Sequence, residues 1–195
     1  MRKIGILGGT FNPVHNGHIK IALEAYEYLR LDKLLLIPSG YSYMKSDEEI
    51  APATMRLEML MLAVRDYPQL TVSDMELKRE GPTYTYETIK ELRETYVNSE
   101  FYFIIGADTL VNMENWKNPA DIFENVTIVV KNRDNHPEYL KAKYETRIIY
   151  LPDGKIDVSS RLIRERLKTN ESVKDLIPEA VLDFITRNSL YMECI

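Results

Sequence analysis

Two histidines three residues apart follow a pair of glycines near the N-terminus of this chain. Gly8 and Gly9 come after a short apolar stretch, and His15 and His18 open a segment with helical periodicity. A glycine pair lets the backbone turn sharply and approach a ligand closely, and the free N–H groups at a helix start attract anions. Because both imidazoles can face that helix end, the spacing favours a polyphosphate site. Either histidine alone would more simply be a capping or surface residue.

Other kinds of site fit this segment less well. It is neither the dinucleotide fingerprint G-x-G-x-x-G nor the Walker loop G-x-x-x-x-G-K-[ST], which disfavours a dehydrogenase and a P-loop ATPase. The third histidine, His136, stands in a polar segment without a cysteine nearby. A metal site built on these histidines is therefore disfavoured too.

A second candidate cluster lies far downstream. Ser159 and Ser160 can cap a helix, with Arg164 one turn inside it. Hydroxyls and an arginine at a helix start suit a phosphate-binding site, although an ordinary Ser-capped surface helix fits the same residues. Between the two clusters, an apolar stretch ends in Gly106 and Asp108. A carboxylate beyond the carboxyl end of a strand can hold ribose hydroxyls, or it can simply cap a turn or helix.

The complete string from Gly8 to His18, G-G-T-F-N-P-V-H-N-G-H, resembles the nucleotidyltransferase superfamily signature T/S-F-x-P-x-H-x-G-H. The segment 158–164 is similar to that superfamily's I-S-S-T-x-x-R, with Ser159, Ser160 and Arg164 matching and Arg161 in place of its Thr. Two further segments narrow the resemblance to the bacterial nicotinate mononucleotide adenylyltransferases. Residues 104–108 resemble their I-I-G-x-D element, and 82–85 resemble their P-S/T-Y-T element, near the nicotinate ring. Trp116 follows at the position of an aromatic that can stack on the pyridine.

This resemblance spans nearly the whole chain and implies an enzyme that transfers AMP from ATP to nicotinate mononucleotide, forming deamido-NAD and pyrophosphate in NAD biosynthesis. It implies catalytic roles for His15, His18 and Arg164. The ATP-binding residues it implies are Gly8, Gly9, Thr10, Phe11, His15, His18, Gly106, Asp108, Ser159, Ser160 and Arg164. The acceptor-binding residues it implies are Lys45, Thr83, Tyr84, Thr85 and Trp116. We expect Mg²⁺ to bind through the ATP phosphates, without dedicated protein ligands.

Two departures from the family pattern fall on segments that are expected to border the acceptor or the nucleotide. Residues 41–45 replace the common P-P-H-K but keep its lysine, and residues 131–134 replace the common R-P-G. Nicotinamide mononucleotide therefore stays open as the preferred acceptor. The chain length and the elements at 83–85 and 104–108 argue against phosphopantetheine as the acceptor. A non-catalytic nucleotide-binding regulator on the same fold is a further alternative, but both signature histidines are present.

Short apolar runs alternate along the chain with segments of helical period, which is typical of a parallel sheet covered by helices. We expect an α/β fold with a Rossmann-like doubly wound parallel sheet, a single domain over residues 1–195 with a small C-terminal helical portion. The expected strands are 3–7, 33–37, 70–73, 101–105, 126–130 and 148–151. The expected helices are 17–31, 54–66, 85–96, 159–168 and 173–188. Segments 39–52 and 133–145 are expected to be loops that border the site.

Composition limits the class of protein. A net charge of -5 argues against a generic nucleic-acid binder, and 45% hydrophobic residues suit a globular domain. The single cysteine, Cys194, can form no intrachain disulfide, so a reducing cytoplasm is the expected location. No apolar run is long enough for a membrane span or a signal peptide. The partners expected are ATP and the mononucleotide, with oligomeric state open and a homo-oligomer possible.

Overall fold

Six parallel strands form the centre of the molecule, in a computed structural model that describes residues 1–40, 50–131, 148–152 and 157–192. The strands are β1 (Arg2–Gly9), β2 (Lys33–Pro38), β3 (Leu70–Val72), β4 (Ser99–Gly106), β5 (Thr127–Lys131) and β6 (Ile148–Leu151). Their order in the sheet is β3-β2-β1-β4-β5-β6, and every pair is parallel. The strand order reverses between β1 and β4, which makes their carboxyl ends the expected ligand crevice of a doubly wound sheet.

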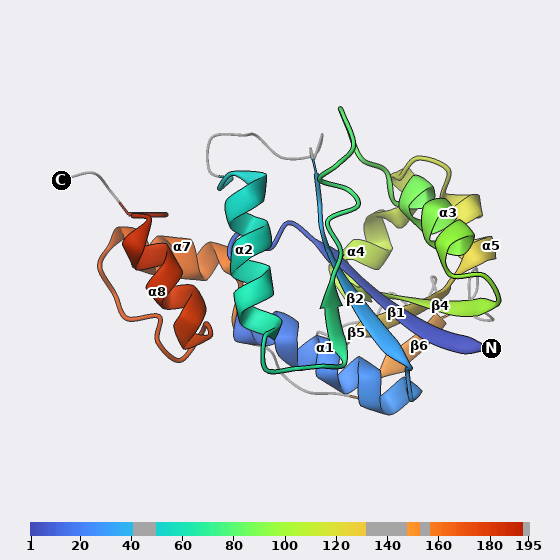
Figure 1. Cartoon of the computed structure of the whole chain (residues 1–195), viewed down its shortest axis with the longest axis horizontal. Coiled ribbons are helices and arrows are strands. Elements are labelled where there is room, and N and C mark those ends of the chain that lie inside the picture. Colours follow the sequence, from blue (N-terminus) through green and yellow to red (C-terminus); the bar gives the residue numbers. More distant parts are fainter. Residues whose placement is uncertain (41–49, 132–147, 153–156, 193–195) are drawn as a thin grey trace.

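Helices cover both faces of this sheet (Figure 1). They are α1 (Asn16–Leu29), α2 (Ala53–Val64), α3 (Thr85–Thr95), α4 (Ala107–Asn112), α5 (Pro119–Asn125), α7 (Ser160–Lys168) and α8 (Glu179–Arg187), with a 3₁₀ turn, η2, at Met113–Asn115. One core cluster joins α1, α2, α7 and α8 to the sheet, and a second cluster joins α3, α4 and α5 to its other face. The chain therefore has the expected Rossmann-like α/β architecture.

The strands are apolar on both sides because helices bury both faces. Leu34 and Leu36 of β2 pack in the first cluster, whereas Leu35 and Ile37 pack in the second. Side chains alternate across a strand, so a strand covered on both faces reads as a continuous apolar run. This is why the six strands were predictable from the sequence, with ends that differ by at most a few residues.

The helices agree less completely with the prediction. The expected helix 173–188 begins only at Glu179, with Pro178 as its N-cap. A proline lacks the N–H that a continuing helix would need. The chain before it turns instead, and the Leu176 carbonyl accepts a hydrogen bond from the N–H of Asn16 at 2.9 Å. This C-terminal portion thus lies against the first turn of α1.

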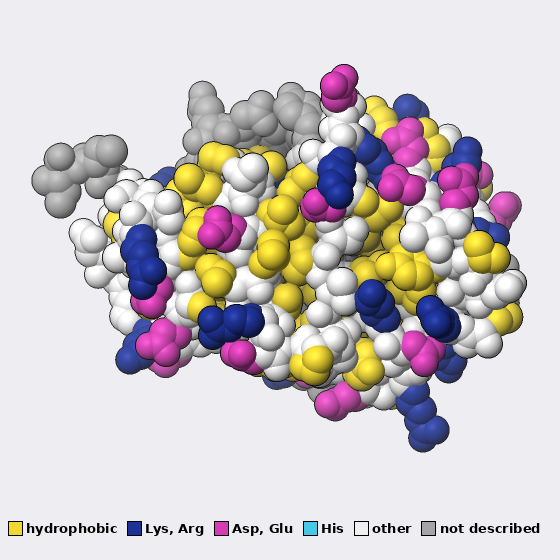
Figure 2. Space-filling view, in the orientation of Figure 1, with side chains coloured by type: hydrophobic (Ala, Val, Ile, Leu, Met, Phe, Trp, Pro, Cys, Tyr) yellow, Lys and Arg dark blue, Asp and Glu magenta, His cyan; other side chains and the backbone are white. Residues whose placement is uncertain are grey.

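Three short elements, α4, η2 and α5, were not predicted. The expected loop segments fall largely on 41–49 and 132–147, outside the described residues, and so does Lys45. On the face shown in Figure 2, basic and acidic side chains are interspersed. Among the described helices, none is long and apolar enough to cross a membrane.

Candidate active site

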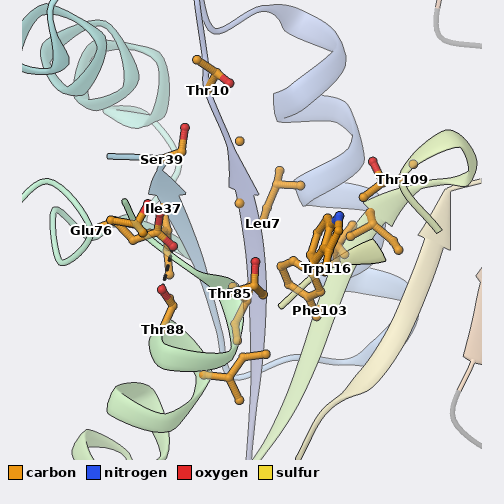
Figure 3. Close-up of a pocket in the computed structure, with 18 of the residues that line it drawn as sticks. Leu7, Thr10, Ile37, Ser39, Glu76, Thr85, Thr88, Phe103, Thr109 and Trp116 are labelled. Atoms are coloured by element: carbon orange, nitrogen blue, oxygen red, sulfur yellow. Dashed lines mark hydrogen bonds between the residues drawn. The ribbon is translucent and has the colours of Figure 1, made fainter. Parts of the chain in front are cut away.

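A cavity of about 430 Å³ opens at the carboxyl ends of β1, β2 and β4 (Figure 3). Its lining includes many residues that the sequence pointed to: Gly8, Gly9, Thr10, His18, Thr83, Tyr84, Thr85, Gly106, Asp108 and Trp116. In Figure 3, Glu76 and Thr88 lie on one side of β1, and Phe103 and Trp116 lie on the other. The cavity thus occupies the crevice that the strand order predicts.

The glycine pair does not form the turn that the sequence predicted. Gly8 and Gly9 are the last residues of β1, and the left-handed conformation belongs to Phe11, with φ of 50°. A Cβ atom on Gly9 would lie 3.4 Å from the Phe11 ring, and both glycines line the cavity. Their contribution is therefore a bare strand end that a ligand can approach.

The two signature histidines form one unit at the start of α1. His15 is the N-cap, and its backbone N–H donates to Nδ1 of His18 at 3.2 Å. The two rings stack with centroids 3.7 Å apart, and the edge of Phe11 packs on His18 at 4.9 Å. His18 lines the cavity, whereas His15 lies behind it and is 4% exposed.

The bond to Nδ1 determines what the His18 ring can do. An acceptor nitrogen carries no proton, so in the neutral imidazole the proton is on Nε2. Nε2 is then a hydrogen-bond donor fixed by stacking and by the backbone. Such a donor suits a phosphate oxygen.

Helix α7 holds the backbone of the loop that follows β1. Ser159 caps the helix by accepting from the Leu162 N–H at 3.2 Å. Ser160 Oγ donates to the Pro13 carbonyl and Arg164 Nη1 donates to the Asn12 carbonyl, each at 2.9 Å. The two segments predicted to act together are therefore in contact, while direct binding of phosphate by Ser160 and Arg164 stays a prediction.

The opposite side of the cavity has its own hydrogen-bond network around Glu76. Its two carboxylate oxygens accept from Thr83 Oγ1 at 3.0 Å and from Thr88 Oγ1 at 2.7 Å, and Thr88 accepts from Arg79 Nη1 at 2.8 Å. These bonds fix the turn that leads into α3, where Tyr84 is the N-cap. The predicted acceptor turn is thus held rigidly beside the cavity.

Aromatic side chains complete this side. Trp116 packs edge-on against Phe103 with centroids 6.3 Å apart, and both line the cavity. Lys117 Nζ lies 4.1 Å from the centre of the Tyr84 ring, which is within cation–π distance. A flat aromatic ligand would find a π-face and a cation here.

Comparison with known proteins identifies the family of this chain. The Cytidylyltransferase-like family model matches residues 6–166. A probable nicotinate-nucleotide adenylyltransferase of Clostridium acetobutylicum is 38% identical over 98% of this chain and 100% of its own length, and one from Clostridium perfringens is 41% identical over 98% of each. The chain belongs to the nicotinate-nucleotide adenylyltransferase family.

Solved structures agree on the fold of this family. The nicotinic acid mononucleotide adenylyltransferase of Plasmodium falciparum, complexed with NaAD, superposes with a TM-score of 0.85 over 98% of each chain at 19% identity. A second structure of that protein, complexed with APC, gives a TM-score of 0.83 at 18% identity. The architecture is therefore shared at low sequence identity.

In this adenylyltransferase, several polar residues near the site were not predicted as functional, and Glu76, Lys131 and Arg56 are the most extensively bonded of them. Lys131 is 2% exposed, forms an ion pair with Glu24 at 2.5 Å and donates to the Pro152 carbonyl at 3.0 Å. Arg56, 3% exposed, donates to backbone carbonyls around the loop after β1. Lys131 was visible as a departure from the family's R-P-G, but carbonyl partners such as those of Arg56 leave no pattern in a sequence.

Proposed function

We propose that this chain transfers the AMP unit of ATP to nicotinate mononucleotide, forming deamido-NAD and pyrophosphate. The observation that carries the proposal is the cavity itself. It joins the His18 donor at the first turn of α1 to the aromatic wall formed by Trp116 and the turn at Thr83 to Thr85. A polyphosphate fits the first side, and a pyridine ring fits the second.

The reaction proposed is an in-line displacement. The acceptor's 5′-phosphate oxygen attacks the α-phosphorus of ATP, the α–β bridging P–O bond breaks, and its electron pair leaves with pyrophosphate. Because the nucleophile is already an anion, no general base is needed. Catalysis then consists of positioning both substrates and stabilising charge on the phosphoryl oxygens.

The residues divide this work by their places in the structure. Nε2 of His18 would donate to an α- or β-phosphate oxygen. His15 would hold the His18 ring in place and also contribute to binding of the α- and β-phosphates. Ser160 and Arg164, already bound to the loop backbone, would stabilise the β/γ end of the triphosphate. Asp108, at the start of α4, would hold ribose hydroxyls, and Lys45 would meet the acceptor.

We propose Mg²⁺ as the cofactor, bound through the phosphates of ATP. Within the described residues, no three His, Cys, Asp or Glu side chains form a metal-binding cluster. Phosphate oxygens and water, which Mg²⁺ prefers, would be its ligands. When bound, the ion would neutralise charge on the polyphosphate. We also propose a cytoplasmic location, because the single Cys194 can form no intrachain disulfide.

The test supplies purified protein with ATP and Mg²⁺ and compares pyrophosphate release with nicotinate mononucleotide, nicotinamide mononucleotide and phosphopantetheine. The proposal expects the highest kcat/KM with nicotinate mononucleotide. Higher efficiency with another acceptor would correct the substrate. No release with any acceptor would refute the enzymatic role.

A further inference from the structure

Arg56 of α2 is a buried cation whose hydrogen bonds all go to backbone carbonyls. Nε donates to Ala51 at 3.1 Å, and Nη1 donates to Thr10 at 2.8 Å and to Ser39 at 2.9 Å. In the part of the chain that the structure describes, no carboxylate shares these bonds. Burial lowers the pKa of this guanidinium, while the nearby Tyr191 raises it.

The three carbonyls come from three separate segments of the chain. Thr10 follows β1, Ser39 follows β2, and Ala51 leads into α2. Burying a charge costs free energy unless its hydrogen bonds are made, so an apolar residue would be the cheaper choice for packing alone. The planar fork of arginine instead fixes several acceptors at defined positions.

The network extends from Ala51 to the C-terminal end of the described chain. The Ala51 N–H donates to Asn12 Oδ1 at 3.0 Å, and the Tyr191 hydroxyl donates to the same oxygen at 2.6 Å. Burial raises the pKa of Tyr191, so its hydroxyl keeps its proton at neutral pH. The buried Asn12 side chain is thus held from two directions, while Arg164 holds its carbonyl.

Neither Arg56 nor Tyr191 lines the cavity, but Thr10 and Ser39 do. Thr10 belongs to the triphosphate side, and Ser39 lies at the end of β2, next to Gly40, which packs against Glu76 and Thr83 of the acceptor side. A shift in this network would therefore change the distance between the two sides of the cavity.

We propose that Arg56 and Tyr191 are positioning residues that align the loop after β1 with the end of β2, so that ATP and the acceptor meet in line. This inference rests on the proposed function. Because each substrate keeps its own contacts, loss of alignment should lower the rate of the chemical step more than it weakens either binding. Misplacement of about 1 Å can cost about 100-fold in rate.

Two conservative variants test the proposal. Arg56→Lys keeps the charge but cannot bond three carbonyls with a planar fork, so we expect a single-turnover rate lower by roughly 10- to 100-fold. Tyr191→Phe removes one hydroxyl without burying a new polar group, and we expect a fall of about 3- to 10-fold, matching roughly one hydrogen bond. Dissociation constants for ATP and for nicotinate mononucleotide should stay within about 3-fold of the parent's.

Matched controls separate this role from a merely structural one. Arg65→Lys makes the same exchange at an exposed site beside α2, and Tyr28→Phe makes the same exchange at an exposed site on α1. Neither should change the rate. ATP-binding stoichiometry gives the fraction of folded sites, so the rate is expressed per competent site.

The single-turnover formation of the dinucleotide decides among the outcomes. Lower rates per site with near-parent affinities, in both variants, support the proposal. An Arg56→Lys rate within 2-fold of the parent overturns it; if that variant does not fold, an unchanged rate for Tyr191→Phe overturns it instead. A parent inactive with every acceptor refutes the proposed function and this inference with it, whereas an active parent with unaffected variants refutes the inference alone.

Discussion

His18 contributes through one ring nitrogen, because the other accepts the His15 N–H. Under the proposed function, replacing His18 with Ala removes a preorganised donor to the transferring phosphoryl group. We expect kcat to fall by at least about 100- to 1,000-fold, the usual cost of one such donor. Initial rates of pyrophosphate release measure this effect, and an unchanged circular dichroism spectrum shows that the fold survives. Near-parent turnover of the folded variant would contradict the role given to His18.

Trp116 should act on the acceptor rather than on ATP. Aromatic stacking contributes about 0.5–1.5 kcal/mol, so Trp116→Ala should raise the KM for nicotinate mononucleotide by roughly 2- to 13-fold. The KM for ATP should stay the same. Trp116→Phe keeps a π-face at the same position and serves as the control, with a smaller change expected. Equal increases in the KM for ATP and the KM for nicotinate mononucleotide in Trp116→Ala would contradict a role of this ring in acceptor binding alone.

At the level of single residues, sequence patterns identified side chains that face the cavity better than those that support it. His18, Trp116 and the turn at Thr83 to Thr85 were all predicted and all line the cavity. Arg56 was missed because its partners are carbonyls, which every residue type presents. Ser160 and Arg164 were predicted, but their bonds to the Asn12 and Pro13 carbonyls were not.

At the level of elements, the segment just after β2 is in direct contact with the turn at Thr83 to Thr85. A Cβ atom on Gly40 would lie 2.7 Å from the Glu76 carbonyl oxygen and 2.9 Å from Thr83 Cγ2. Overpacking of this kind costs about 1–3 kcal/mol. Gly40→Ala should therefore displace the turn and raise the KM for nicotinate mononucleotide by about 5-fold or more, with little effect on the KM for ATP.

Ser39→Ala is the matched control for this prediction, because it changes the neighbouring residue without adding an atom. Because Ser39 also lines the cavity, this variant measures the loss of its hydroxyl alone, and the rise in acceptor KM for Gly40→Ala should exceed any change it shows. An unchanged acceptor KM in Gly40→Ala would contradict the role proposed for the turn at Thr83 to Thr85 in acceptor binding. Both variants are measured in the same steady-state assay.

Element length explains which parts of the fold the sequence predicted. The strands are continuous apolar runs because both faces of the sheet are buried, and α1 and α3 are long enough to show a periodic apolar face. By contrast, α4 and α5 span six and seven residues, which is too short for a period to emerge. The first six residues of the predicted helix 173–188 were wrong, because Pro178 is the N-cap and the helix starts at Glu179.

For the whole molecule, the half-buried Tyr191 links stability to pH through its hydroxyl. Burial raises its pKa in the folded state, so the folded protein keeps a proton that the unfolded chain loses above about pH 10. The contribution of this hydroxyl to the free energy of unfolding is fully present below that pH and declines as the pH rises further. The free energy of unfolding, measured with urea between pH 8 and 11, should fall less steeply in Tyr191→Phe than in the parent. Identical slopes would contradict this linkage.

The proposed transfer of AMP would use the His18 donor, the aligned strand ends and both sides of one cavity. It is tested most directly by following labelled ATP in the presence of Mg²⁺ and nicotinate mononucleotide. A label on the α-phosphate should appear in deamido-NAD, and a label on the γ-phosphate should appear in pyrophosphate. Label released as inorganic phosphate, or retained covalently on the protein, would contradict a direct transfer of AMP between the two substrates.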